Sequence, residues 1–112
     1  MLRKSLRFAK DIRNFTNRLP KTISNIEDSK QLTRSSGSVG ANYIEANESL
    51  SKKDFLLRLK ISRKEAKESR YWLNLLTLNG AQDLEETRAG LVQEATELMN
   101  IFGAILRKTG NH

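Results

Sequence analysis

The strongest constraint on the fold is a repeating stripe of apolar and small residues in the middle of the chain. Its members alternate in steps of four and three, and they are Phe55, Leu59, Ser62, Ala66, Ser69, Leu73 and Leu76. An α-helix places such positions on one face, which other helices must cover. The segment 52–79 is therefore predicted to be one long helix, capped by Ser51 at its start and by Asn79-Gly80 at its end. Because the centre of the stripe is small, a neighbouring helix can approach it closely.

A second stripe on the same segment indicates that this helix has two sets of neighbours. Its members are Leu57, Ile61, Glu65, Glu68, Trp72 and Leu75. Only 38% of the chain is hydrophobic, which is low for a self-sufficient monomer of 112 residues. Contact with further copies of the chain is therefore predicted. The candidates for that interface are Leu57, Ile61, Trp72 and Leu75.

Two further helices are predicted on either side of this segment. Residues 2–19 carry apolar side chains at steps of three and four, and Pro20 disfavours continuation of the helix. Residues 84–108 show a similar apolar stripe. Acidic residues stand at the start of that segment and Arg107-Lys108 at its end, which suits the helix dipole.

The segment between residues 21 and 47 is ambiguous. It contains a run of small residues, Ser35 to Ala41, with two glycines and three serines. Propensity alone favours a linker there, because Gly and Ser are poor helix formers. The alternative is a helix whose small residues allow a neighbouring backbone to come close.

Composition gives little support to catalysis or metal binding. The chain has no cysteine, and its one histidine, His112, is the last residue. Catalysis or metal binding by a cysteine thiolate is therefore excluded. Acid–base catalysis or zinc binding by histidine is not favoured, because only one histidine is present. No cofactor and no metal are expected. The longest apolar runs are only a few residues, so no membrane span is expected and the expected location is the cytoplasm.

Three glutamates are the candidates for a specific role in the structure or in chemistry, and they are Glu45, Glu65 and Glu68. No histidine follows them at the spacing of a di-iron bundle, and no pocket or substrate group for acid–base work is indicated. The favoured interpretation is a structural polar network, within the bundle or between protomers. The expected partners are Arg34, Asn42 and Arg70. Enzymatic activity is the least favoured of the hypotheses.

The net charge of +7 is unevenly distributed. Residues 1–30 carry eight basic residues against three acidic ones, residues 31–82 carry nine against five, and residues 83–112 carry three against five. A basic excess confined to the first three-quarters of the chain suggests an anionic partner, with nucleic acid the leading candidate. The alternative is a soluble, lysine-rich surface.

Two helices carry this charge at helical spacing. The candidates for nucleic-acid binding are Arg3, Arg7, Lys10, Lys60, Arg63, Lys64, Lys67 and Arg70. The basic residues of either helix, the three in segment 2–19 or the five in segment 52–79, could bind phosphates without contacting the bases. The alternative is a solvated face crossed by local pairs such as Lys64 with Glu68. Base stacking by Tyr71 and Trp72 is less favoured, because the aromatic residues of a bundle more often fill a core or an interface.

Taken together, four segments resemble a bacterial four-helix-bundle family. They are Leu19 to Thr22, Gln31 to Ala46 (QLTRSSGSVGANYIEA), Ser51 to Phe55 (SKKDF) and Ile61 to Leu73 (ISRKEAKESRYWL). Members of this family were first noticed as proteins encoded in intervening sequences of bacterial large-subunit ribosomal RNA genes. The accessory protein of diversity-generating retroelements is another member. The resemblance covers nearly the whole chain.

The resemblance implies an all-α, antiparallel up-down four-helix bundle, in a single domain over residues 1–112. The expected helices span residues 2–19, 22–47, 52–79 and 84–108, so the ambiguous segment becomes a helix that ends at a left-handed Asn47. The protomers are expected to form a ring-shaped homo-oligomer, typically a pentamer. The implied function is non-catalytic binding of RNA or DNA as an accessory factor, beside a reverse transcriptase or another protein. A protein-interaction scaffold with no nucleic-acid role is the alternative.

Overall fold

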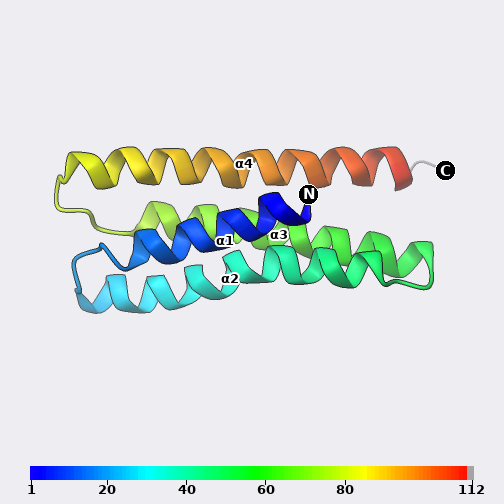
Figure 1. Ribbon diagram of the computed structural model, residues 1–112, viewed down its shortest axis with the longest axis horizontal. Coiled ribbons are helices and arrows are strands. Elements are labelled where there is room, and N and C mark those ends of the chain that lie inside the picture. Colours follow the sequence, from blue (N-terminus) through cyan, green and yellow to red (C-terminus); the bar gives the residue numbers. More distant parts are fainter. Residues whose placement is uncertain (111–112) are drawn as a thin grey trace.

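The computed structural model describes residues 1–110, so His112 lies outside the described residues. Four helices follow one another along the chain: α1 (Leu2–Thr16), α2 (Ile23–Asn47), α3 (Lys52–Leu75) and α4 (Gln82–Gly110). They run alternately in opposite directions along one axis (Figure 1). Each helix packs on its neighbours in the chain, and α4 closes back onto α1. The predicted all-α four-helix bundle is confirmed, and residues 1–110 contain no strand.

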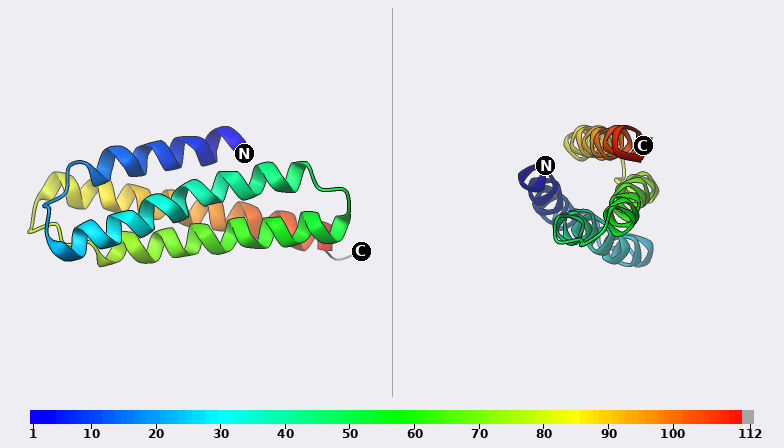
Figure 2. Two further views of the ribbon diagram at one scale, coloured as in Figure 1. Left: turned by 90° about the horizontal axis from the view of Figure 1, so that it is seen from below. Right: turned by 90° about the vertical axis from the view of Figure 1, so that its right-hand side faces the viewer.

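One helix is much shorter than the others. α1 has 15 residues, whereas α2, α3 and α4 have 25, 24 and 29. Residue 1 consequently lies partway along α4, and three helices alone form the end of the bundle at the α2–α3 turn (Figures 1 and 2).

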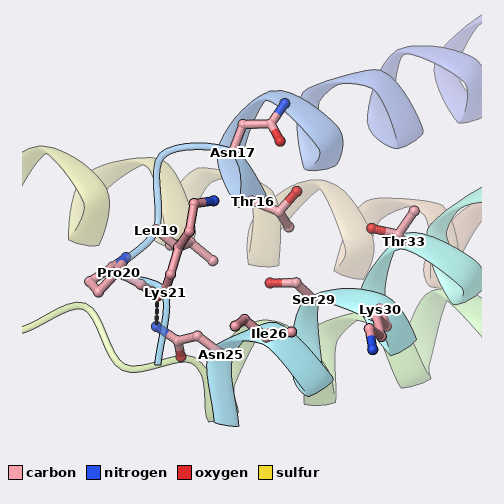
Figure 3. A pocket seen from close by; sticks show the side chains of 10 residues that line it. All are labelled: Thr16, Asn17, Leu19, Pro20, Lys21, Asn25, Ile26, Ser29, Lys30 and Thr33. Atoms are coloured by element: carbon pink, nitrogen blue, oxygen red, sulfur yellow. Dashed lines mark hydrogen bonds between the residues drawn. The ribbon is translucent and has the colours of Figure 1, made fainter. Parts of the chain in front are cut away.

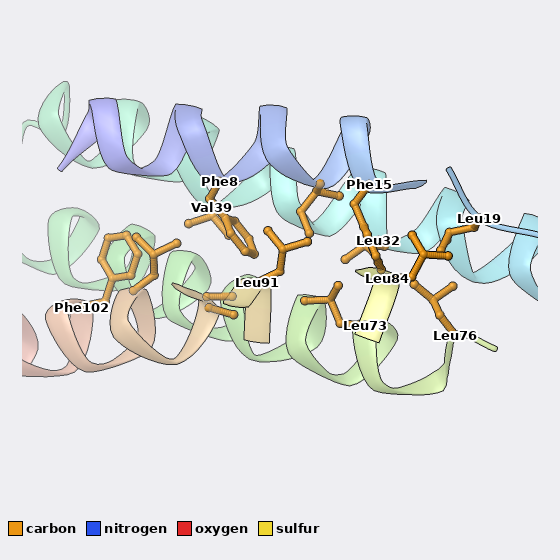
Figure 4. Close-up of a cluster of buried hydrophobic side chains, with 14 of the residues drawn as sticks. Phe8, Phe15, Leu19, Leu32, Val39, Leu73, Leu76, Leu84, Leu91 and Phe102 are labelled. Carbon is orange, nitrogen blue, oxygen red and sulfur yellow. The ribbon is translucent and has the colours of Figure 1, made fainter. Parts of the chain in front are cut away.

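The core is a column of aromatic and aliphatic side chains enclosed by the four helices (Figure 4). Its largest fully buried members are Phe8, Ile12, Phe15, Leu32, Leu59, Leu73, Leu98 and Phe102. The stripe that the sequence predicts along α3 faces this core from Leu59 to Leu76, while Phe55 is half-buried. Hydrophobic burial along this column is the main force that holds the helices together.

Small residues form the contact between α2 and α3. The hydroxyls of Ser35 and Ser69 lie 2.8 Å apart and both residues are fully buried, while Ser62 donates a hydrogen bond of 2.9 Å to the carbonyl of Val39. The loop favoured by propensity for residues 35–41 is therefore wrong. Tertiary contact overrides the poor helix propensity of serine and glycine.

A small residue also lies where α2 packs on α1. A Cβ added at Gly40 would lie only 3.3 Å from the Cβ of Ser5 on α1. The absence of a side chain at Gly40 therefore lets α1 and α2 approach closely. α2 ends at Asn47, and the capping residue Glu48 has φ −96° and ψ 2°. Asn47 itself is helical, so the predicted left-handed Asn47 is wrong.

Three helices end at places that periodicity did not predict. α1 stops at Thr16 instead of residue 19, because the chain tightens into a turn before Pro20, with the amide of Leu19 donating to the carbonyl of Thr16. α4 begins and ends two residues outside the predicted range of 84–108. α3 stops at Leu75 instead of residue 79, and Asn79 and Gly80 adopt positive φ values of 54° and 75° in the following loop.

The early end of α3 has a specific cause, which is the side chain of Asn25 on α2. Its amide nitrogen donates to the carbonyls of Pro20 and Thr77, and its oxygen accepts from the amide of Thr77, all at 2.9 Å. Arg88 of α4 donates to the carbonyl of Leu76 at 2.6 Å. These contacts replace the bonds that a further helical turn would make.

Candidate nucleic-acid interface

A groove between α3 and α4 gathers unpaired positive charge, and we call it the basic groove. Its lining residues are Lys60, Arg63, Lys64 and Lys67 from α3 and Met99, Asn100, Gly103 and Arg107 from α4. The hollow has a volume of about 460 Å³. Four of the predicted nucleic-acid-binding residues thus lie together. Arg107 was not among the candidates, because spacing within α3 could not show which residues of α4 lie opposite.

Within residues 1–110, no carboxylate forms an ion pair with any of the five cations of the basic groove. All seven ion pairs among residues 1–110 involve other basic residues. The local pair of Lys64 with Glu68 does not form, since Glu68 instead accepts from Arg34 at 3.2 Å. The groove therefore presents a concentrated positive field to solvent.

The basic row of α1 lies in different surroundings. Arg3, Lys4 and Arg7 line a hollow between α1 and α4 that also contains Glu94. Lys4 pairs with a glutamate of α4 at 3.3 Å, and Arg7 lies 4.0 Å from an aspartate one turn further along α1. Lys10 is exposed and does not line this hollow. Nearby carboxylates weaken the field on this side, so it is the poorer candidate for an anion site.

Arg70 is also separated from the groove. Its Nη1 donates to the hydroxyl of Thr96 at 3.1 Å, and the side chain is half-buried between α3 and α4. This contact links α3 to α4, and Arg70 does not line the basic groove.

The predicted polar network forms in part, between α2 and α3. Arg34 donates to both Glu65 and Glu68 at 3.2 Å, and the side chain of Glu65 is only 7% exposed. Asn42 accepts from Arg58 at 3.1 Å, while Glu45 is exposed and forms no ion pair among the described residues. A buried carboxylate requires such a partner, because an unpaired one would be costly to desolvate.

The outer face of α3 leaves apolar side chains uncovered. Leu57 is 54% exposed and Leu75 is 45% exposed, whereas Ile61 and Trp72 are half-buried. The ring of Tyr71 packs edge-on against Trp72, with centroids 5.2 Å apart. No aromatic residue lines the basic groove.

A third hollow, of about 420 Å³, lies between α1, α2 and the turn that joins them (Figure 3). The amide of Asn25 bonds to the carbonyl of Pro20 at its edge, and the ionisable side chains that line it are Lys21 and Lys30. With two lysines and no carboxylate, this lining offers no acid–base pair. Residues 1–110 hold no cluster of three or more potential metal ligands, and none of their helices meets the length and apolarity needed to span a membrane.

One carboxylate between α1 and α4 is perturbed. Burial raises the pKa of Glu94 above its ordinary value of 4.5, and Asp11 raises it further, whereas Arg7 and Lys4 lower it and Glu97 raises it slightly. One oxygen of Glu94 is buried without a hydrogen-bond partner among the described residues. The folded protein therefore holds this proton to a higher pH than the unfolded chain does.

Replacing Glu94 with glutamine should stabilise the protein at neutral pH and not in acid. With a raised folded-state pKa, stability falls as pH rises from 4.5 through that pKa, and glutamine has no proton to lose. Thermal unfolding at about pH 7 and about pH 4 tests this expectation. The control is Glu97→Gln, which removes the partner of Lys4 and should give no gain. An equal shift in Tm at both pH values for Glu94→Gln would contradict the prediction.

The chain and its fold are similar to known proteins. The model of a family described as 23S rRNA-intervening sequence protein matches residues 1–104. The chain is also similar to a solved structure from Bacteroides thetaiotaomicron, described as a protein of unknown function from the S23 ribosomal protein family. The two share 33% sequence identity with a TM-score of 0.78, over 94% of this chain and 96% of that chain. No curated protein matches the sequence.

Proposed function

This chain belongs to the 23S rRNA-intervening sequence protein family, and we propose that it binds nucleic acid, without catalysis, through the basic groove. The observation that carries the proposal is the convergence of five cations from two helices, none of which forms an ion pair with a carboxylate of the part of the chain that the structure describes. Such a surface attracts polyanions from a distance and releases their counterions on contact.

The composition of the groove favours contact with phosphates over contact with bases. It is lined by lysine, arginine, methionine, asparagine and glycine, and it offers no aromatic platform for stacking. Phosphate contacts carry no sequence information. The ligand class is therefore RNA or DNA bound through its backbone, as expected of an accessory factor that works beside a reverse transcriptase or another nucleic-acid enzyme.

A ring of protomers would multiply this surface. The exposed Leu57 and Leu75 on the outer face of α3, with the half-buried Ile61 and Trp72 beside them, support self-association. A closed ring, typically a pentamer as the family resemblance implies, would present several basic grooves to one strand. Several weak phosphate sites then act together with an affinity that none has alone.

Nucleic-acid binding is expected to weaken steeply with salt and to depend on Lys64 and Lys67. In titrations of labelled RNA and DNA at several salt concentrations, the Lys64→Gln/Lys67→Gln variant should lower the salt slope by about 2, with weaker binding to every sequence alike. The matched control is Lys21→Gln/Lys30→Gln, which removes the same charge on the α1–α2 side. Absence of binding at low salt, or binding indifferent to salt, would refute the proposed function.

Self-association is expected to depend on the apolar residues of α3. Light scattering at micromolar concentration should give the mass of an oligomer for the native chain. The Leu57→Glu/Leu75→Glu variant should give the mass of a monomer, because charge is costly to bury in an apolar interface. The control is Ile23→Glu, at a residue that is 86% exposed on α2. A native chain that is already monomeric would contradict the ring.

The second candidate function is a scaffold that binds a protein and no nucleic acid. The exposed Tyr71, at 58%, beside the exposed Leu75 favours it, because both would suit a protein partner. The same salt titration decides between the two, since a scaffold keeps its oligomer and shows no affinity for RNA or DNA.

A further inference from the structure

Most arginines of this chain bond to another group of the protein. Of the ten in the sequence, seven form a hydrogen bond or an ion pair with another group of the protein. These are Arg7, Arg13, Arg18, Arg34, Arg58, Arg70 and Arg88. The other three, for which residues 1–110 provide no such partner, are Arg3, Arg63 and Arg107. Two of these three lie in the basic groove.

Arg63 and Arg107 meet over a glycine. A Cβ added at Gly103 would lie 3.3 Å from Nη1 of Arg107 and 4.0 Å from Nη1 of Arg63. Two guanidinium groups from different helices therefore approach one point above bare backbone. Like charges repel, and an anion between the two groups would turn that repulsion into attraction.

We infer that Arg63 and Arg107, above Gly103, form a seat for a single phosphate group. This inference rests on the proposed function and makes it more specific. The planar donors of arginine fit phosphate oxygens in pairs, whereas the ammonium of lysine acts as a flexible point charge. The two arginines would fix the position of one phosphate, while Lys60, Lys64 and Lys67 supply the surrounding field.

Gly103 leaves room for both guanidinium groups. Glycine in the interior of a helix is less stable than alanine, and Gly103 lies well inside α4. An added side chain would occupy the space beside both guanidinium groups.

The chain contains an internal comparison. Gly37 also has an arginine above it, since its added Cβ would lie 3.3 Å from Nη2 of Arg13. Nη1 of Arg13, however, already donates to the carbonyl of Ala9 at 3.0 Å. No second arginine meets it there, so this site lacks the paired arrangement.

Charge-conserving substitutions test the seat. The full-length Arg63→Lys/Arg107→Lys variant keeps the net charge but loses the paired donors. It is expected to bind RNA about tenfold more weakly than the native chain, with an unchanged salt slope. Gly103→Ala is expected to weaken binding several-fold while the helix gains stability. The control Arg13→Lys, which changes an arginine outside the basic groove, should bind as tightly as the native chain.

The outcomes separate the seat from the function. If RNA binds but Arg63→Lys/Arg107→Lys binds it equally well, the seat is overturned and the proposed function stands. A further arm adds inorganic phosphate and follows the arginine side-chain Nε–H resonances by NMR. If RNA does not bind but phosphate shifts the resonances of Arg63 and Arg107, the seat stands and the function falls. If neither ligand binds, both are refuted.

Discussion

Replacing Asn25 with alanine is expected to lower the free energy of unfolding by about 3 kcal/mol, because three hydrogen bonds are lost at once. Asn25 is 1% exposed, and its side chain joins the carbonyl of Pro20 to both backbone groups of Thr77. The substitution leaves these backbone groups without their partner. It also loosens the point where the α1–α2 turn meets the end of α3. Urea unfolding followed by circular dichroism measures the change.

The control for this experiment is Asn74→Ala, in the last turn of α3. Asn74 is exposed, and its side chain makes no hydrogen bond with another described residue, so its removal should change stability by less than about 0.5 kcal/mol. Equal stability of the Asn25→Ala and Asn74→Ala variants would mean that the bonds to Thr77 do not stabilise the folded chain.

The Ser69→Leu substitution is expected to be equally damaging, at about 3 kcal/mol, because it both overpacks the α2–α3 contact and removes a buried hydroxyl. Ser69 is fully buried, lies 2.8 Å from the hydroxyl of Ser35 and donates to the carbonyl of Glu65 at 2.9 Å. The milder Ser69→Ala removes the hydroxyl without crowding and should cost about 1 kcal/mol. The order of the two variants in urea unfolding separates steric crowding from loss of hydrogen bonds.

Asn74→Leu adds the same side chain to an exposed position of the same helix, and it should be nearly neutral. If Ser69→Leu were as stable as Asn74→Leu, the small residues between α2 and α3 would not be close-packed. That result would remove the physical reason for a helical Ser-Gly run.

The fold could be predicted from the sequence where a helix carries its own signal. The stripe from Leu59 to Leu73 on α3 is visible without any partner, because its period matches that of the helix. The segment from Ser35 to Ala41 has no such signal, and propensity gave the wrong answer. Its helical state depends on contacts with Ser62 and Ser69, far along the chain. The family resemblance, confirmed by the family match, supplied that missing information.

The site was less predictable than the fold. Lys60, Arg63, Lys64 and Lys67 could be found by spacing alone, because all four lie on α3. From the sequence, Arg107 is only a basic residue that suits the helix dipole at the end of α4. Its position near Arg63 depends on how α3 and α4 pack together, which the sequence does not show. The same limit explains Arg70, whose spacing matches Arg63 and Lys67 but whose hydroxyl partner, Thr96, lies on α4.

The up-and-down order of the helices has a kinetic consequence. α1 contacts α2, α2 contacts α3, and α3 contacts α4, so most pairings join segments that are adjacent in the chain. Such a bundle can assemble as a series of short helical hairpins, each with a small loop-closure entropy, and topologies of this kind fold fast. Only the pairing of α1 with α4 joins distant segments. That pairing therefore carries the largest single loop-closure cost of the fold.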